Sequence, residues 1–148
     1  DGNNVARSLA VVCGLLGMRF VLASPAAYRF DAGFRQHLRT ILPAAAIEET
    51  EDPVAAVSGA AVVYTDVWAS MGQEQERAAR LRAFAPYQVN AALMRHCPDA
   101  LFMHCLPARR GEEVTDEVID GPQSVVVEEA ANRMHVQKGL LAWLLGHR

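Results

Sequence analysis

Phe102-Met103-His104-Cys105-Leu106-Pro107 is the stretch of sequence that decides the fold. The apolar run from Ala100 to Met103 predicts a buried strand, which continues into a His-Cys pair and is stopped by Pro107. Reactive side chains followed by a chain reversal are expected at the carboxyl edge of a sheet, where open α/β proteins bind their ligands. Cys105 is therefore the first candidate for chemistry.

Strands and helices alternate on both sides of this stretch. Strands are predicted over 18–23, 45–50, 60–65, 100–104 and 124–127, and helices over 5–16, 31–42, 52–59, 74–84, 90–96, 116–120 and 128–147. The alternation predicts an α/β fold, with a doubly wound parallel sheet flanked by helices in a Rossmann-like order. In the order 3-2-1-4-5 the first, central strand would precede Asp1. We therefore expect a sheet without its central strand, in a piece of a longer protein.

The composition narrows the class of protein. The chain has 148 residues, of which 51% are hydrophobic and 21% charged, and these values are typical of one folded domain and not of a disordered chain. A net charge of −3 without a basic block argues against nucleic acid as a partner. No apolar run reaches the roughly 20 residues that cross a membrane. Three cysteines without a Cys-x-x-Cys pair indicate a reducing, cytoplasmic setting.

Unusual polar residues follow three of the expected strands. The turn Asp1-Gly2-Asn3-Asn4 opens the first helix, Asp66 to Glu74 follow the strand 60–65, and Cys105-Leu106-Pro107 follow the strand 100–104. Because the carboxyl ends of parallel strands share one edge of a sheet, we expect all three segments to lie at the same edge.

Each candidate residue has a structural and a functional interpretation. Asn4 suits a helix N-cap, or an anion site at the helix N-terminus. Asp66 suits a cap, or a carboxylate partner for an ammonium group. Ser70 suits a cap, and Met71 suits the core. Cys105 suits an inert buried thiol, a hydrogen-bond donor, or an activated nucleophile.

Metal and nucleotide sites lack a motif. The pairs His96-Cys97 and His104-Cys105 do not show zinc spacing, and neither a Walker loop nor a G-x-G-x-x-G run is present. Arg133, expected at the start of the last helix, suits a solvated side chain or an anchor for a phosphate or carbonyl oxygen. The charged residues 109–113 are expected to form a solvated loop or a mobile lid.

Taken together, the motifs resemble those of the ornithine carbamoyltransferase family. They are Asp-Gly-Asn-Asn at 1–4, Asp-x-Trp-x-Ser-Met-Gly-Gln-Glu at 66–74, Tyr-Gln-Val-Asn at 87–90, His-Cys-Leu-Pro at 104–107, Glu-Val-Thr-Asp-Glu-Val at 113–118 and Asn-Arg-Met-His-x-Gln-Lys at 132–138. The Ser-Met-Gly and His-Cys-Leu-Pro motifs separate this resemblance from one to aspartate carbamoyltransferases. It covers residues 1–148 and only the carboxyl-terminal, ornithine-binding domain of the family, so we expect the amino-terminal carbamoyl-phosphate domain to be absent.

The resemblance implies an ornithine site. Asn4 and the backbone N–H of Met71 would hold the α-carboxylate of L-ornithine, and Asp66 and Ser70 its α-ammonium group. Cys105 would lie beside the side-chain amine.

The same resemblance implies contacts with carbamoyl phosphate. Cys105 would lie near carbamoyl phosphate, the Leu106 carbonyl would orient the reacting groups, and Arg133 would reach the carbonyl oxygen of carbamoyl phosphate. Ala131 stands where the family usually has Glu, which predicts looser anchoring of Arg133.

The implied reaction transfers a carbamoyl group to the δ-amine of L-ornithine, giving L-citrulline and phosphate in arginine biosynthesis. It requires neither a metal nor an organic cofactor, and the family enzyme is expected to be a cytoplasmic trimer. The phosphate loop of the family lies in the other domain, so we expect no turnover from these residues alone. The alternatives are a carbamoyltransferase for another amine, such as putrescine, and a non-catalytic α/β module that binds an amino acid or a protein.

Overall fold

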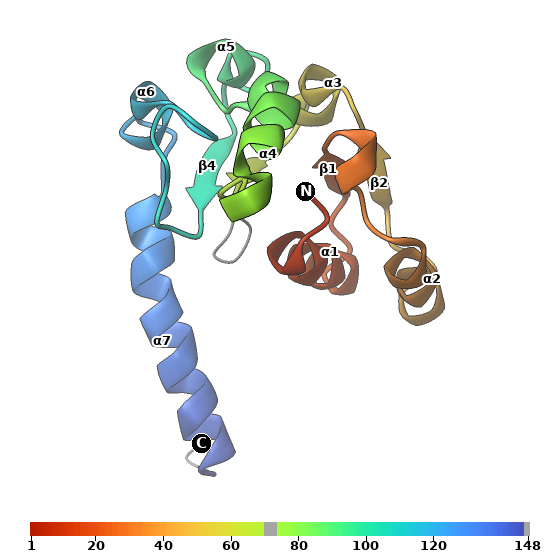
Figure 1. Cartoon of the computed structure of the whole chain (residues 1–148). Helices are drawn as coiled ribbons and strands as arrows, with labels where there is room; N and C mark the ends of the chain where they lie inside the picture. Colours follow the sequence, from red (N-terminus) through yellow and green to blue (C-terminus); the bar gives the residue numbers. More distant parts are fainter. Residues whose placement is uncertain (70–73, 147–148) are drawn as a thin grey trace.

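The strands form two parallel pairs in the computed structural model, which describes residues 1–69 and 74–146. Strand β1 (Phe20–Ala23) pairs with β2 (Ile47–Thr50), and β3 (Val62–Thr65) pairs with β4 (Leu101–His104). Helices flank both pairs (Figure 1). The expected α/β fold is confirmed as a partial Rossmann-like domain, with strand order β1-β2 in one sheet and β3-β4 in the other.

Helices lie within or close to the predicted ranges, and two further short helices, at 26–28 and 85–87, were not predicted. The helices are α1 (Asn4–Leu15), η1 (Ala26–Tyr28), α2 (Ala32–Ile41), α3 (Pro53–Val57), η2 (Glu74–Glu76), α4 (Arg77–Phe84), η3 (Ala85–Tyr87), α5 (Ala91–Met94), α6 (Asp116–Ile119) and α7 (Val126–Leu144). The side chains of Asp31, Asp52 and Asn90 accept backbone N–H groups at the starts of α2, α3 and α5. Such caps satisfy donors that a helix leaves without partners, which explains where these helices begin.

Each strand pair has its own apolar core. Leu22 and Phe30 are among the buried residues beside β1, and Phe102 and Val114 are among those around β4. Phe102 is fully buried. Burial of one such side chain contributes about 1.5–3 kcal/mol. The two cores therefore stabilise the two halves of the fold, one around β1 and β2 and the other around β3 and β4.

Arg80 of α4 joins the two halves. Its Nη1 donates to Asp1 Oδ2 at 2.7 Å and to the Trp68 carbonyl at 3.2 Å, and its guanidinium carbon lies 4.8 Å from the centre of the Tyr28 ring. The side chain is only 9% exposed. Since a buried cation must be paired, Arg80 fixes α4 and the segment after β3 against the turn that opens the chain.

The prediction of a strand over 124–127 is wrong. Phe102 N donates to the Gln123 carbonyl and Val125 N to the Phe102 carbonyl, so the chain makes one isolated bridge to β4 at Ser124. It then enters α7 at Val126. The run of valines favours a strand, but Glu128 and Glu129 in the first turn favour a helix N-terminus.

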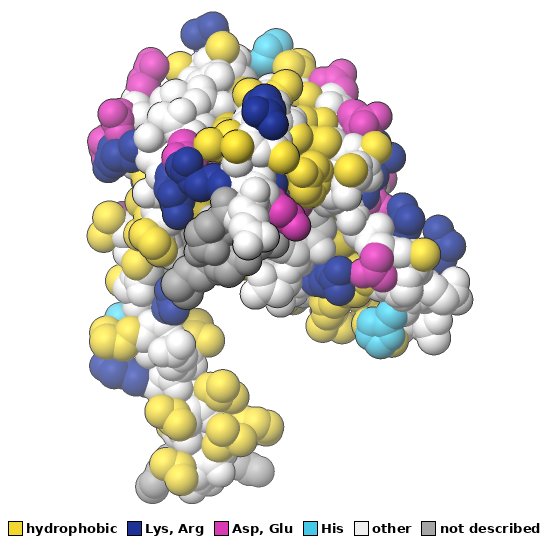
Figure 2. Space-filling view, in the orientation of Figure 1, with side chains coloured by type: hydrophobic (Ala, Val, Ile, Leu, Met, Phe, Trp, Pro, Cys, Tyr) yellow, Lys and Arg dark blue, Asp and Glu magenta, His cyan; other side chains and the backbone are white. Residues whose placement is uncertain are grey.

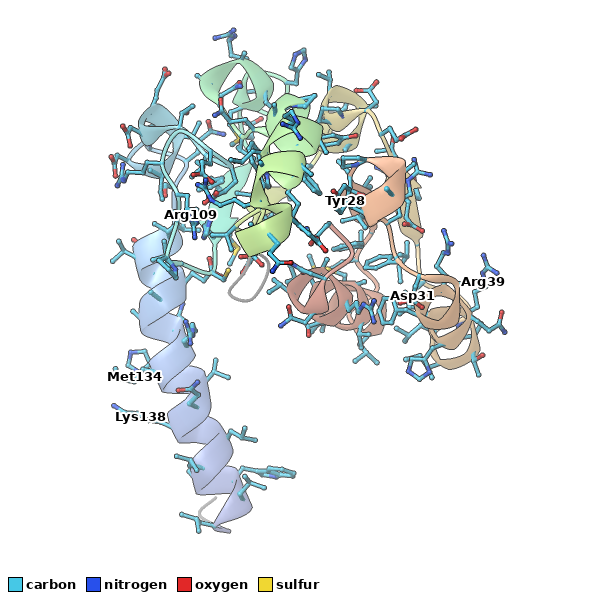
Figure 3. All side chains as sticks on the ribbon, in the orientation of Figure 1. Tyr28, Asp31, Arg39, Arg109, Met134 and Lys138 are labelled. Carbon is cyan, nitrogen blue, oxygen red and sulfur yellow. The ribbon has the colours of Figure 1, made fainter. Side chains whose placement is uncertain are left out.

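Helix α7 extends away from the rest of the fold (Figure 1). The apolar residues expected on its packed face are half or more exposed: Met134, Leu141, Leu144 and Leu145. Figure 2 shows hydrophobic side chains over the lower part of the helix, and Figure 3 shows Met134 and Lys138 projecting from it. Among the described residues, no helix combines the length and the apolar character needed to cross a membrane.

Candidate functional site

Asp66, directly after β3, receives hydrogen bonds from two other segments. Asn3 Nδ2 donates to Asp66 Oδ2 at 3.1 Å, and Cys105 Sγ donates to Asp66 Oδ1 at 3.1 Å. The Val67 N–H adds a third bond, 2.7 Å long, to Oδ1. The expected meeting of the three turns at one edge is therefore confirmed, and Asp66 is its centre.

The register of the second sheet brings Asp66 and Cys105 together. Thr65 of β3 lies opposite His104 of β4 in a parallel pair. The next residue of each strand is therefore also side by side, and neighbouring parallel strands point equivalent residues to the same side. The sequence predicts that the two segments share one edge of the sheet, and the register adds that both strands end at the same level.

Asn3, and not Asn4, caps the first helix. Asn3 Oδ1 accepts the N–H of Ala6 at 3.0 Å, whereas Asn4 is the first residue of α1 and its side chain is exposed. The N-cap interpretation of Asn4 is thus wrong by one position. Two consecutive Asn residues before an apolar helix allow either one to cap, so the pattern alone does not select between them.

Gly2 lets the opening turn lie against the backbone after η1. The Gly2 N–H donates to the Tyr28 carbonyl at 2.7 Å. A Cβ atom at Gly2 would lie 2.7 Å from the Arg29 carbonyl carbon and 2.7 Å from Phe30 N. Only glycine fits this approach, which places Asn3 beside Asp66.

The Cys105 thiol is a hydrogen-bond donor in this arrangement. Partial burial, together with its hydrogen bond to Asp66 and the negative charge of that carboxylate, raises the pKa of Cys105 to about 12. At neutral pH the group is therefore a thiol and not a thiolate. Of the three interpretations of Cys105, the geometry favours the donor and disfavours the activated nucleophile.

Glu129 links the first turns of α7 to both strands of the second sheet. Its Oε1 accepts from Tyr64 OH at 3.1 Å, and its Oε2 accepts from His104 N at 3.0 Å. Burial first, and then the neighbouring Cys105 and Glu129 side chains, raise the pKa of Tyr64. Sequence reasoning missed both Tyr64 and Glu129, because a tyrosine on a strand and a glutamate in a first helical turn are common without a shared role.

The charged segment 109–113 is only partly the solvated loop that the sequence predicts. Arg110 is half exposed and pairs with Asp116 and Asp120. Glu112 pairs with Arg77 of α4. Glu113, in contrast, is fully buried and lies 3.1 Å from His104 Nε2. A carboxylate can be buried where hydrogen-bond donors surround it, and the spacing of charges along the chain does not reveal this.

The remaining predicted site residues are placed differently or not described. Ser70 and Met71 lie outside the described residues. Leu106 follows Cys105 in the turn, and its N–H donates to His104 Nδ1 at 2.9 Å. Arg133 is exposed within α7, which begins at Val126, so the expectation that it starts the last helix is wrong. Ala131, in the same helix, is also exposed.

In the described parts of the chain, no group of three His, Cys, Asp or Glu side chains is placed to hold a metal ion. His104, the histidine nearest in sequence to Cys105, is bonded through both ring nitrogens to groups of the protein. Both ring nitrogens are therefore occupied by hydrogen bonds within the protein, and the role of the ring is structural.

A comparison with protein families decides the assignment. The family described as "Aspartate/ornithine carbamoyltransferase, Asp/Orn binding domain" matches residues 1–144. The chain belongs to this family. It is 54% identical over 150 residues to the ornithine carbamoyltransferase of Chromobacterium violaceum, covering 100% of this chain and 48% of that protein. It is 53% identical over 148 residues to that of Symbiobacterium thermophilum, covering 98% of this chain and 48% of that protein.

Solved structures agree with this family. The chain superimposes on ornithine carbamoyltransferase from Pyrococcus furiosus with a TM-score of 0.88 and 51% identity, covering 96% of this chain and 46% of that one. The chain therefore spans about half the length of the relatives that it matches.

Proposed function

We propose that the chain is the ornithine-binding domain of an ornithine carbamoyltransferase, and that it contributes the amino-acid half of an active site. The whole enzyme would transfer the carbamoyl group of carbamoyl phosphate to the δ-amine of L-ornithine, giving L-citrulline and phosphate for arginine biosynthesis. The observation that carries this proposal is the meeting of Asn3, Asp66 and Cys105 at one sheet edge, in a chain of this family.

The chemistry of a free amino acid suits the residues assigned to it. A zwitterion needs a carboxylate for its ammonium group and N–H donors for its carboxylate. In the proposal Asp66 and Ser70 bind the α-ammonium group, and Asn4 and the Met71 N–H bind the α-carboxylate. The three hydrogen bonds that Asp66 accepts support its part, because they hold the carboxylate in one orientation before substrate arrives.

Cys105 and Leu106 are assigned to the reacting amine. An alkyl ammonium group with a pKa near 10.4 is neutral in only about one molecule in a thousand at neutral pH, and only the neutral amine attacks. A protonated thiol offers a polarisable sulfur without adding the negative charge that would stabilise the ammonium form. The raised pKa of Cys105 supports this part of the proposal. The Leu106 carbonyl accepts an N–H of the amine and so orients its lone pair.

The carbamoyl-phosphate half of the reaction is assigned elsewhere. Of the residues in this chain, Arg133 would reach the carbonyl oxygen of carbamoyl phosphate, and the phosphate ligands would come from an amino-terminal domain. These 148 residues alone should therefore produce no citrulline. We further propose that the whole enzyme is a trimer and works in the cytoplasm without a metal or an organic cofactor.

A joined protein tests the proposal. The chain is fused behind the part of the Pyrococcus furiosus enzyme that it does not cover, and folding is checked by circular dichroism and size-exclusion chromatography. We expect citrulline from carbamoyl phosphate and L-ornithine with the joined protein and none with the chain alone. A folded joined protein that makes no citrulline would contradict the function, and rapid turnover by the chain alone would contradict the division of labour.

A substrate panel separates the first alternative. Putrescine has a second ammonium group but no α-carboxylate, so the ligands assigned to that carboxylate, Asn4 among them, would have nothing to bind. The joined protein should therefore carbamoylate L-ornithine and leave putrescine unchanged. Preference for putrescine would favour the other carbamoyltransferase, and a folded but inactive joined protein would favour the non-catalytic module.

A further inference from the structure

We propose that Glu113 and His104 are a buried positioning pair that holds the turn Cys105-Leu106-Pro107 in the conformation needed at the reacting amine. The inference rests on the proposed function, because that function assigns the Cys105 thiol and the Leu106 carbonyl to this amine. Both side chains of the pair are 0% exposed. They act through the turn and do not touch the substrate, so they are positioning residues and not catalytic ones.

Glu113 is the fixed end of the pair. Its Oε1 accepts from His104 Nε2 at 3.1 Å and from the Arg109 N–H at 2.6 Å, and Figure 3 labels Arg109 on this loop. Its Oε2 is buried without a hydrogen-bond partner among the described residues. Burial of a carboxylate is unfavourable unless hydrogen-bond donors pair with it. The donors found here are the imidazole and the loop backbone, so those are the groups whose positions the carboxylate sets.

His104 carries this constraint to the turn. Its Nδ1 accepts the N–H of Leu106 at 2.9 Å and therefore bears no hydrogen. The hydrogen of the neutral ring must then be on Nε2, where it is donated to Glu113. Glu113 thus selects the tautomer that leaves Nδ1 free to accept. Without that acceptor, the ring would not hold the Leu106 N–H.

Leu106 needs this support because its backbone is strained. Its φ is +52°, in the left-handed region that is unfavourable for a residue with a side chain. The hydrogen bond from the Leu106 N–H to His104 offsets this strain. Losing the bond to His104 therefore lets the turn relax. Relaxation moves the Leu106 carbonyl and the thiol of the residue before it.

The backbone around the pair gives it a rigid base. The Val89 N–H donates to the Glu113 carbonyl at 2.9 Å, and Val114 is fully buried beside it. On the other side, His104 N donates to Glu129 at the start of α7. The backbone of His104 is therefore held by Glu129, and its ring is held by Glu113. The conformation of the turn that follows depends on these two contacts.

The tautomer of His104 tests the pair in the unsubstituted chain. Long-range proton–nitrogen NMR spectra at neutral pH should show His104 with hydrogen on Nε2 and a bare Nδ1. An Nδ1–H tautomer, or a doubly protonated ring, would overturn the proposal. This measurement needs neither activity nor a variant, so it stands even if the joined protein makes no citrulline.

Two substitutions of Glu113 test the consequence for the turn. Glu113→Gln keeps an oxygen that accepts from His104 and Arg109, whereas Glu113→Ala removes it. Hydrogen exchange of the Leu106 amide should rise at least about tenfold in Glu113→Ala and stay within about threefold of the parent in Glu113→Gln. Glu117→Ala, at an exposed position of α6, is the control. Unchanged Leu106 exchange in a folded Glu113→Ala chain would overturn the proposal.

Kinetics separate positioning from stability. In the joined protein, Glu113→Ala should lower kcat at least about tenfold with a smaller change in KM for ornithine, and Glu113→Gln should restore kcat to within about threefold. Equal losses in both variants, or a change in KM alone, would contradict a positioning role. If the joined protein is inactive while the NMR results hold, the pair stands and the proposed function fails.

Discussion

The sulfur of Cys105 lies 3.1 Å from Oδ1 of Asp66, and the thiol donates its hydrogen to the carboxylate. The two residues come from separate strands and meet because β3 and β4 end at the same level. Asp66 also binds Asn3, so the contact is part of a small network that includes the opening turn. A carboxylate beside a half-buried thiol keeps that thiol protonated, and this property can be measured.

We expect Cys105 to react slowly with iodoacetamide at neutral pH. Its pKa is raised to about 12, and only the thiolate reacts. Asp66→Ala should lower this pKa and raise the alkylation rate at least about tenfold, since each pKa unit changes the thiolate fraction tenfold. Mass spectrometry follows Cys13, Cys97 and Cys105 separately. Equal Cys105 rates in the parent and in Asp66→Ala would contradict the hydrogen bond.

The raised pKa of Cys105 predicts that the free energy of unfolding falls at alkaline pH. Because the folded pKa of Cys105 is raised to about 12 from an ordinary value of 9.0, its contribution to stability is complete below pH 9.0 and is lost as pH rises through about 12. Urea unfolding of the parent and of Cys105→Ala should therefore converge over this range. A difference between the two chains that is constant with pH would contradict the shift.

Arg80 should matter for stability more than any exposed arginine. Arg80→Met leaves Asp1 and the Trp68 carbonyl without their donor, and breaking a buried ion pair costs about 3–5 kcal/mol. Arg39→Met, at an exposed position of α2, should change the free energy of unfolding by less than about 0.5 kcal/mol. Urea denaturation measures both. Similar small effects would show that Arg80 does not join the two halves.

Two glycine substitutions should have opposite signs. Gly2→Ala places a Cβ atom 2.7 Å from the backbone of Arg29, and such overpacking costs about 1–3 kcal/mol. A Cβ atom at Gly139, inside α7, would meet no described atom within 4 Å beyond the helix's own backbone, so Gly139→Ala should stabilise the chain by about 0.5–1 kcal/mol. Thermal unfolding detects both shifts. A neutral Gly2→Ala would contradict the close approach of the opening turn.

The exposed part of α7 should contribute little to stability in this chain. Leu22→Ala in β1 removes a buried side chain and should cost about 2–5 kcal/mol. Leu141→Ala makes the same change at a residue that is 59% exposed, and should cost less than about 0.5 kcal/mol. Urea denaturation of the two variants compares them directly. A large loss in Leu141→Ala would mean that α7 packs against something in solution.

Local patterns predicted much of the site. The strand ends at Asp66 and Cys105 follow from apolar runs that stop at turn residues, and parallel pairing then brings the two side chains together. The caps at Asp52 and Asn90 follow from the preference of these side chains for backbone N–H groups. Signals of this kind depend on a few neighbouring residues.

Features set by distant residues were missed. The run of charges around Glu113 predicts a solvated side chain. Its burial depends on His104, which lies on another element, and the local pattern does not reveal that partner. Asn3 and Asn4 are equivalent as caps until Asp66 selects one of them. The valines before α7 favour a strand locally, but β4 accepts only one bridge at that position. In each case tertiary contacts override the local preference.

We propose that Asp66 and Cys105 form the amino-acid side of a carbamoyltransferase site. The most direct measurement is kcat/KM for L-ornithine in the joined protein, with Asp99→Ala and Cys13→Ala as controls away from the site. We predict that Asp66→Ala and Cys105→Ala each lower kcat/KM at least about tenfold, or about 1.4 kcal/mol, while the controls stay near the parent. Near-normal values in both site variants would contradict the account.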